Sequence, residues 1–210
     1  MPSVQDTAYP KLRSNPTEKD LLRLYTPSLD ELGLASRVTR HPVTRLSFLI
    51  LLKTFQRLGY GIALARVPAS IICHIVMSAQ MPTSQQNLSQ YDPSATRKRH
   101  LPIVRDYLQI AAFDRTAHQA MVKALQMAGL TKHDLVDLIN IAIEELVRQR
   151  FELPGFSTLE RAARTVRKHH MQQLWLRFSA SPSATLWRPQ PNIRSARRGL
   201  PSQYFKAISA

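Results

Sequence analysis

Three cations near the end of the chain have the spacing of one helix face. Arg161, Arg164 and Lys168 are separated by three and four residues, so a helix over 158–177 places them together, opposite its apolar residues. A row of cations one turn apart can lie along a phosphate backbone, and each phosphate contact adds counterion release to the affinity. The spacing therefore indicates a nucleic-acid contact, and the alternative interpretation is a solvated basic face.

The densest cationic cluster lies earlier in the chain, at residues 96–100. Arg97, Lys98 and Arg99 are followed by Pro102, and proline is tolerated in a helix only within the first turn. We therefore expect the cluster to lie in the approach to a helix, where backbone N–H groups and arginines can both face phosphate. The alternative is a surface loop. The candidate DNA-binding residues are Arg97, Lys98, Arg99, Arg161, Arg164 and Lys168.

The overall charge points to the same kind of partner. The 210 residues contain 29 Lys and Arg against 14 Asp and Glu, which gives a net charge of +15. Such an excess is typical of proteins that bind nucleic acid. Residues 171–210 contain six of these cations and no acidic residue. Cations in a segment without fixed structure bind any polyanion and carry no sequence specificity, so the segment is not a site by itself.

No pattern of residues predicts catalysis. The chain has only 6 glycines and lacks a phosphate-binding glycine loop, a G-x-S-x-G motif and an H-E-x-x-H motif. His169 and His170 are adjacent, so a helix directs them about 100° apart and away from a shared metal. Asp134 and Asp137 are explained by helix capping. We therefore expect no enzyme activity, no cofactor and no metal site.

The elements that position these residues are predicted to be helices throughout. Apolar residues recur at helical spacing and no run alternates as a strand does. Four Ser or Thr residues precede a carboxylate by three positions, which is the spacing of a capping box at a helix start. These pairs are Thr17 with Asp20, Ser28 with Glu31, Thr131 with Asp134, and Ser157 with Glu160. The expected helices are 17–24, 28–36, 42–58, 67–79, 84–90, 94–109, 115–128, 132–151 and 158–177.

The fold class is therefore all-α: a multi-helix bundle of two small helical subdomains with a disordered basic C-terminal tail. The helix over 42–58 is apolar nearly all round, which predicts the buried centre of the first half. The tail is rich in Pro and Ser and has no periodic apolar face, which predicts disorder. The expected divisions are an arm at 1–16, subdomains at 17–80 and 94–177 with a joint at 81–93 between them, and the tail at 178–210.

Hydropathy predicts a cytoplasmic protein, and DNA binding would associate it with the nucleoid. The longest apolar run, 48–52, is far shorter than the roughly 20 residues that a membrane span needs. Residues 1–16 lack the apolar core of a secretory signal.

Three segments also share the order and spacing of residues of one known family. They are 25–60, with Leu-Gly-Tyr at its end, 91–108, with Thr-Arg-Lys-Arg-His at 96–100, and 140–163, with Phe-Glu-Leu-Pro at 151–154. Over residues 10–170 the chain resembles the N-terminal region of the replicative DDE transposases of the Tn-three family. The resemblance implies helical domains that bind the double-stranded terminal inverted repeats of a transposon. In that family a separate RNase H-like domain holds the catalytic carboxylates and magnesium, and nothing here corresponds to it.

The resemblance stops after His170, where the sequence becomes free of acidic residues. This change predicts a transposase truncated before its catalytic domain, with a tail translated in a shifted frame. The leading hypothesis is a DNA-binding fragment without strand-transfer activity. The alternative is a non-catalytic helical fragment that associates with full-length transposase or is a non-functional relic. No small-molecule substrate is expected under either hypothesis.

Overall fold

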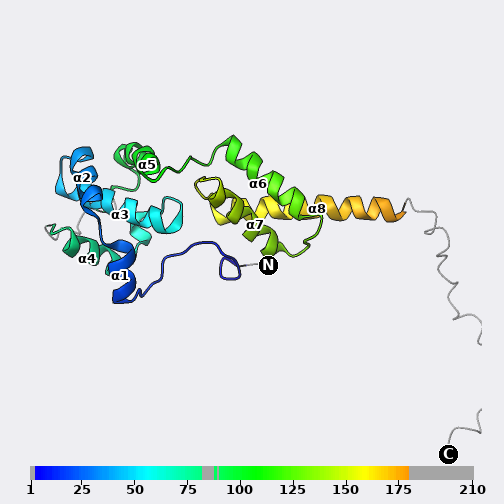
Figure 1. Ribbon diagram of the computed structural model, residues 1–210, viewed down its shortest axis with the longest axis horizontal. Helices are drawn as coiled ribbons and strands as arrows, with labels where there is room; N and C mark the ends of the chain where they lie inside the picture. Colours follow the sequence, from blue (N-terminus) through cyan, green and yellow to red (C-terminus); the bar gives the residue numbers. More distant parts are fainter. Residues whose placement is uncertain (1–2, 82–87, 89, 180–210) are drawn as a thin grey trace, which may run out of the picture. The chain divides into compact units, whose positions relative to one another are not determined.

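The protein is all-α over the part of the chain that the computed structural model describes, residues 3–81, 88 and 90–179 (Figure 1). These residues form helices and an isolated β-bridge between Ala111 and Phe151, but no strand. The helices are α1 (Glu18–Tyr25), α2 (Leu29–Val38), α3 (Pro42–Leu58), the 3₁₀ helix η1 (Leu64–Arg66), α4 (Ala69–Ser78), α5 (Ala95–Leu108), α6 (Arg115–Ala128), α7 (Leu135–Arg148) and α8 (Phe156–Ser179). The all-α prediction is confirmed.

Every expected helix on the described residues is present, with ends within one turn of those expected from the sequence. The expected helix at 84–90 falls largely on residues outside the described part of the chain. The tail beyond residue 179 also lies outside it, and α8 extends to Ser179. The chain forms two units, Met1–His170 and Met171–Ala210. The division into subdomains at 17–80 and 94–177 stays a prediction.

Helix α3 is the centre of a first hydrophobic cluster, as its apolar sequence predicts. Residues 48–52 and Phe55 are fully buried, and α3 contacts α1, α2, α4, α5 and η1 (Figure 1). A helix that is apolar on all sides needs neighbours on all sides, and the surrounding helices provide them. Helix α5 contributes Val104 to this cluster. Helix α3 ends at Gly59, whose φ of 73° is the left-handed conformation that glycine adopts at least cost.

A buried ion pair connects α2 to α3. The Glu31 carboxylate accepts hydrogen bonds from Lys53 Nζ at 3.2 Å and from Gln56 Nε2 at 2.6 Å. It also accepts the backbone N–H of Ser28 at 2.8 Å and completes the capping box expected for α2. The side chains of Lys53 and Glu31 are only 9% and 5% exposed. Because buried charges require partners, this group of contacts constrains how α2 packs on α3.

A second hydrophobic cluster unites α6, α7 and α8 with residues before α1. Tyr9 is 7% exposed and belongs to this cluster. Its hydroxyl donates to the Pro154 carbonyl at 3.0 Å, and the backbone N–H of Ala8 donates to Asn140 Oδ1 at 2.8 Å. Residues 8 and 9 are therefore held against α7 and the start of α8 by specific hydrogen bonds.

Two of the four predicted caps are wrong. Thr131 does not cap α7, because the Asp134 carboxylate itself accepts the N–H groups of Val136 and Asp137. Ser157 lies inside α8, which already begins at Phe156. Thr17 and Ser28 do cap α1 and α2. The spacing of a hydroxyl and a carboxylate does not settle which of the two takes the cap position, since aspartate caps a helix as well as threonine does.

Candidate nucleic-acid interface

Helix α8 presents its cationic row to solvent because its other side is committed to the core. Leu159 and Ala163 are fully buried and Val166 is 7% exposed, all in the second cluster. Arg161, Arg164 and Lys168 lie on the opposite side and are exposed. Near the end of the row, His170 approaches Gly129 so closely that a Cβ there would lie 2.7 Å from its imidazole. Because glycine has no side chain, Gly129 lets α8 pack closely against the end of α6, and this packing helps to hold α8 with its cations facing solvent.

Arg161, Arg164 and Lys168 form the α8 row, and two of these cations, Arg164 and Arg161, have different surroundings. Arg164 Nη2 lies 2.7 Å from the Glu160 carboxylate one turn earlier, and the Arg164 side chain is 43% exposed. Such an exposed pair contributes little free energy, so the guanidinium can exchange this carboxylate for a phosphate. Arg161 borders a cavity of about 360 Å³ between α6 and α8. Arg167 is also exposed on α8 and adds to its positive charge.

The cluster at 96–100 lies inside helix α5, and its expected position before a helix is wrong. The Ser94 hydroxyl caps α5 by accepting the Arg97 N–H at 3.1 Å, so Arg97, Lys98 and Arg99 belong to the first two turns. Pro102 is in the helix interior. A proline there removes its own hydrogen bond to the carbonyl four residues earlier and its ring crowds that carbonyl, yet α5 continues to Leu108 and contacts α3. The loop alternative is excluded as well.

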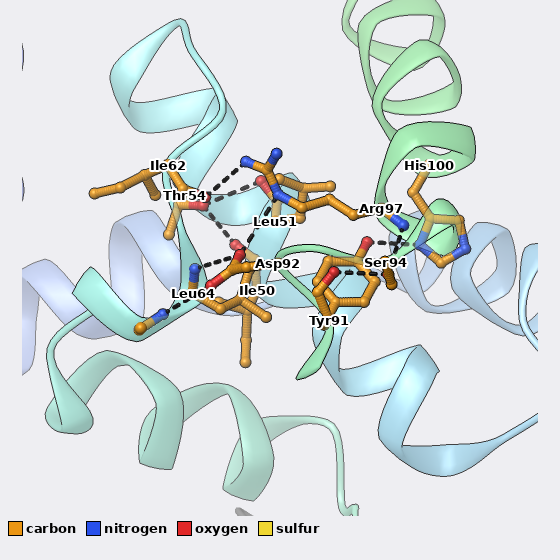
Figure 2. Close-up of polar contacts among 11 residues, drawn as sticks. Ile50, Leu51, Thr54, Ile62, Leu64, Tyr91, Asp92, Ser94, Arg97 and His100 are labelled. Atoms are coloured by element: carbon orange, nitrogen blue, oxygen red, sulfur yellow. Dashed lines mark hydrogen bonds and ion pairs between the residues drawn. The ribbon is translucent and has the colours of Figure 1, made fainter. Parts of the chain in front are cut away.

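Arg97 points into the protein rather than towards solvent. Figure 2 shows its guanidinium between the loop after α3 and the Asp92 carboxylate. Nη2 donates to the Ile62 carbonyl at 3.1 Å, and Nε lies 3.5 Å from Asp92 Oδ1. The same carboxylate accepts the backbone N–H of Leu64 at 2.9 Å. Arg97 therefore joins α5 to the segment between α3 and η1, and its side chain is 19% exposed.

Lys98 and Arg99 are the members of this cluster that remain exposed. Arg99 makes one long hydrogen bond, from Nη2 to the Thr96 hydroxyl at 3.4 Å. Both residues belong to a helix of the first cluster, whereas the α8 row belongs to the second. The structure therefore separates the six candidate residues into two groups and commits Arg97 to an internal contact.

We expect Arg97 and its two neighbours to respond differently to substitution. Arg97→Gln should lower the free energy of unfolding by about 1–3 kcal/mol, because it removes a partly buried charged hydrogen bond and leaves Asp92 behind. Lys98→Gln with Arg99→Gln should leave stability unchanged and reduce DNA affinity. Urea unfolding and fluorescence anisotropy with a labelled duplex measure the two quantities. A stable Arg97→Gln variant with weakened DNA binding would assign Arg97 to the interface.

The next residue, His100, is buried beneath this cluster. Its Nδ1 lies 2.7 Å from the Tyr91 hydroxyl (Figure 2). Its ring packs edge-on against Phe48, with centroids 5.1 Å apart. Burial lowers the pKa of His100 below 6.5, and the positive charge of Arg99 lowers it further. Burial also raises the pKa of the Tyr91 hydroxyl, so both groups are neutral at pH 7.

We expect this imidazole to make the stability of the protein sensitive to acid. Because the folded state lowers the pKa of His100, the unfolded state binds more protons below pH 6.5, and stability should fall as the pH drops through that range. Urea unfolding at pH 7.5 and 5.5 measures the effect. His100→Gln should show a smaller difference between the two pH values. His74→Gln is the comparison variant: burial lowers the pKa of that more exposed histidine as well, so its removal should also reduce the difference. If the stability of His100→Gln differs between the two pH values as much as that of the wild-type protein, His100 is not a source of the acid sensitivity.

A further group of cations was not expected from the sequence. Lys11, Arg13, Arg23 and Arg57 surround one small cavity beside α1. They are spread over more than forty residues, so no local spacing indicated that they meet. Among the described residues there is no group of three or more His, Cys, Asp or Glu that could hold a metal ion. No helix within that same part of the chain is long and apolar enough to cross a membrane.

Comparison with known proteins adds two findings. A sequence model of the family described as "Domain of unknown function (DUF4158)" matches residues 1–166. The chain is also 31% identical over 149 residues to the transposase for transposon Tn501 of Pseudomonas aeruginosa. That alignment covers 70% of this chain and 15% of the transposase, so the chain spans only a small part of its relative's length.

Proposed function

This chain belongs to the family described as Domain of unknown function (DUF4158) and is related to a transposase, and from these premises we propose that it binds double-stranded DNA. The observation that carries the proposal is the α8 row, in which Arg161, Arg164 and Lys168 are exposed opposite a buried apolar side. Lys98 and Arg99 on α5 supply a second exposed group. We assign phosphate contacts to these five residues, because phosphate contacts need charge and exposure but no particular base.

The finer part of the proposal concerns which DNA is bound and what is done to it. We propose that the chain acts as the N-terminal part of a DDE transposase and binds the terminal inverted repeats of a transposon. The similarity to the Tn501 transposase supports a role in transposition, and its restriction to 15% of that protein supports a part without strand-transfer activity. No residue is assigned to base contacts.

A gel-shift titration tests this function directly. The full chain is mixed with duplexes from the ends of the neighbouring mobile element, and a scrambled duplex of equal length and composition is the control. We expect binding to both duplexes that weakens steeply with salt, because phosphate contacts release counterions. Tighter binding to the element ends at equal salt would support repeat recognition. Absence of binding at about 50 mM salt, where nucleic-acid binding is strong, would exclude the proposed function.

A second candidate function is association with an intact transposase without contact to DNA. The observation that favours it is the end of α8, where Trp175 and Phe178 are each 71% exposed and Met171 is 43% exposed on the same side. Under this hypothesis the cationic groups are solvated surface. Binding to DNA that does not depend on salt, or no binding at all, together with capture of a purified transposase would favour this function over the first.

A further inference from the structure

The cavity beside α1 is lined by side chains from three separate parts of the chain. Lys11 and Arg13 come from the segment before α1, Asp20, Arg23 and Tyr25 from α1 itself, and Arg57 from the last turn of α3. Its volume is about 160 Å³. Pockets for drug-sized ligands have volumes of roughly 300–1,000 Å³, so this cavity is suited to a single small group.

The charges around the cavity are strongly unbalanced. Four of its lining residues are cations and Asp20 is its one carboxylate. Asp20 is already paired with Arg13, whose Nη1 lies 2.9 Å away. Lys11, Arg23 and Arg57 therefore face the cavity without a lining carboxylate of their own. Positive side chains that lie close together repel each other, and an anion bound between them offsets this repulsion.

Interaction with helix dipoles accounts for only two of the four cations at the cavity. Arg23 and Arg57 lie in the last turns of α1 and α3, where a cation interacts favourably with the helix dipole. That interaction does not account for Lys11 and Arg13, which come from the preceding non-helical segment. The convergence of both pairs on one cavity is a property of the tertiary structure.

Tyr25 supplies a hydrogen-bond donor at the same place. The residue is 3% exposed and packs in the first hydrophobic cluster, yet it also lines the cavity. Within the described part of the chain its hydroxyl makes no hydrogen bond, and the hydroxyl oxygen itself stays accessible rather than buried. Burial raises the pKa of this hydroxyl while the nearby charges of Arg57 and Arg13 lower it, so the group is a neutral donor close to two guanidinium groups.

We propose that this cavity binds one phosphate group, and that in the DNA complex the group is a backbone phosphodiester. The second part rests on the proposed function. Guanidinium and ammonium groups with one hydroxyl donor match the oxygens of a phosphate, and the cavity is too small for a nucleotide. A phosphate held here contacts α1, α3 and the segment before α1, and so fixes the position of the first cluster on the duplex without reading its sequence.

Two variants of the full chain test the site. Arg23→Gln with Arg57→Gln should reduce the slope of log affinity against log salt by up to about 2, at about 0.9 for each phosphate that the protein no longer neutralises. Tyr25→Phe should weaken binding severalfold and leave the melting temperature unchanged, because the hydroxyl that it removes has no partner within the described part of the protein. Arg37→Gln with Arg40→Gln removes the same charge from exposed positions outside the cavity and is the matched control.

Inorganic phosphate provides a separate measurement. The side-chain Nε–Hε resonances of Arg23 and Arg57 are followed by NMR while phosphate is added at constant ionic strength, with chloride as the control ion. Shifts in the wild-type protein that are reduced in Tyr25→Phe would support the site. A response to phosphate equal to that of chloride would overturn it.

The outcomes separate this inference from the proposed function. If the wild-type protein binds duplex and both cavity variants keep its affinity and salt slope, the cavity is not on DNA, although the proposed function stands. If the protein binds no duplex but phosphate shifts the two arginine resonances, the site holds free phosphate and the assignment to DNA is overturned. A reduced slope in the arginine variant but not in the control supports the whole proposal.

Discussion

Replacing Arg161, Arg164 and Lys168 together by glutamine is expected to weaken binding to duplex DNA of every sequence by on the order of a hundredfold near 0.15 M salt. This figure follows from removing three phosphate contacts, each of which releases about 0.9 counterions, and the slope of log affinity against log salt should fall by up to about 3. The effect should be the same for element ends and scrambled DNA, because phosphate contacts position the protein without reading bases. Fluorescence anisotropy at several salt concentrations measures both quantities.

The fold should survive this triple substitution. The three side chains lie opposite the buried Leu159 and Ala163, and glutamine has a helix propensity close to those of lysine and arginine. The matched control is the triple variant of Arg37, Arg40 and Lys123, which lie on other parts of the chain. If both triple variants bind DNA as the wild-type protein does, α8 is not in the interface. If both weaken equally, net charge alone explains the binding.

Lys53→Met is expected to lower the free energy of unfolding by about 3–5 kcal/mol, the cost of leaving one partner of a buried ion pair uncompensated. The Glu31 carboxylate would keep the Ser28 N–H and Gln56 as donors but lose its charged partner. For a chain of this size 1 kcal/mol corresponds to roughly 2–4 °C, so the melting temperature should fall by at least about 6 °C. Thermal unfolding followed by circular dichroism measures the change.

The double variant Lys53→Met with Glu31→Gln separates charge burial from packing. An uncharged amide needs no cation, so the double variant should recover much of the stability that Lys53→Met loses. Equal stability of the single and double variants would show that the loss comes from packing alone. A fall of less than about 1 kcal/mol in Lys53→Met would contradict a role for the pair in holding α2 on α3.

Local sequence determined the helices, because the periodicity of apolar residues follows directly from helix geometry. The apolar run at 48–52 predicted the buried centre of the first cluster, and the spacing of Leu159, Ala163 and Val166 predicted which side of α8 is buried. The same spacing placed the cations on the exposed side. These properties depend on residues within a few turns of each other, and the backbone fixes their relative directions.

Only the tertiary structure decided which cations remain available. Arg97 and Arg99 belong to one charged run, yet Arg97 turns inward because the Ile62 carbonyl and Asp92 lie beside α5. Lys11 and Arg57 meet at one cavity although 46 positions separate them in the sequence. The direction of a long charged side chain depends on which groups the fold brings near it, and those groups come from distant segments. Periodicity along one helix contains no information about them.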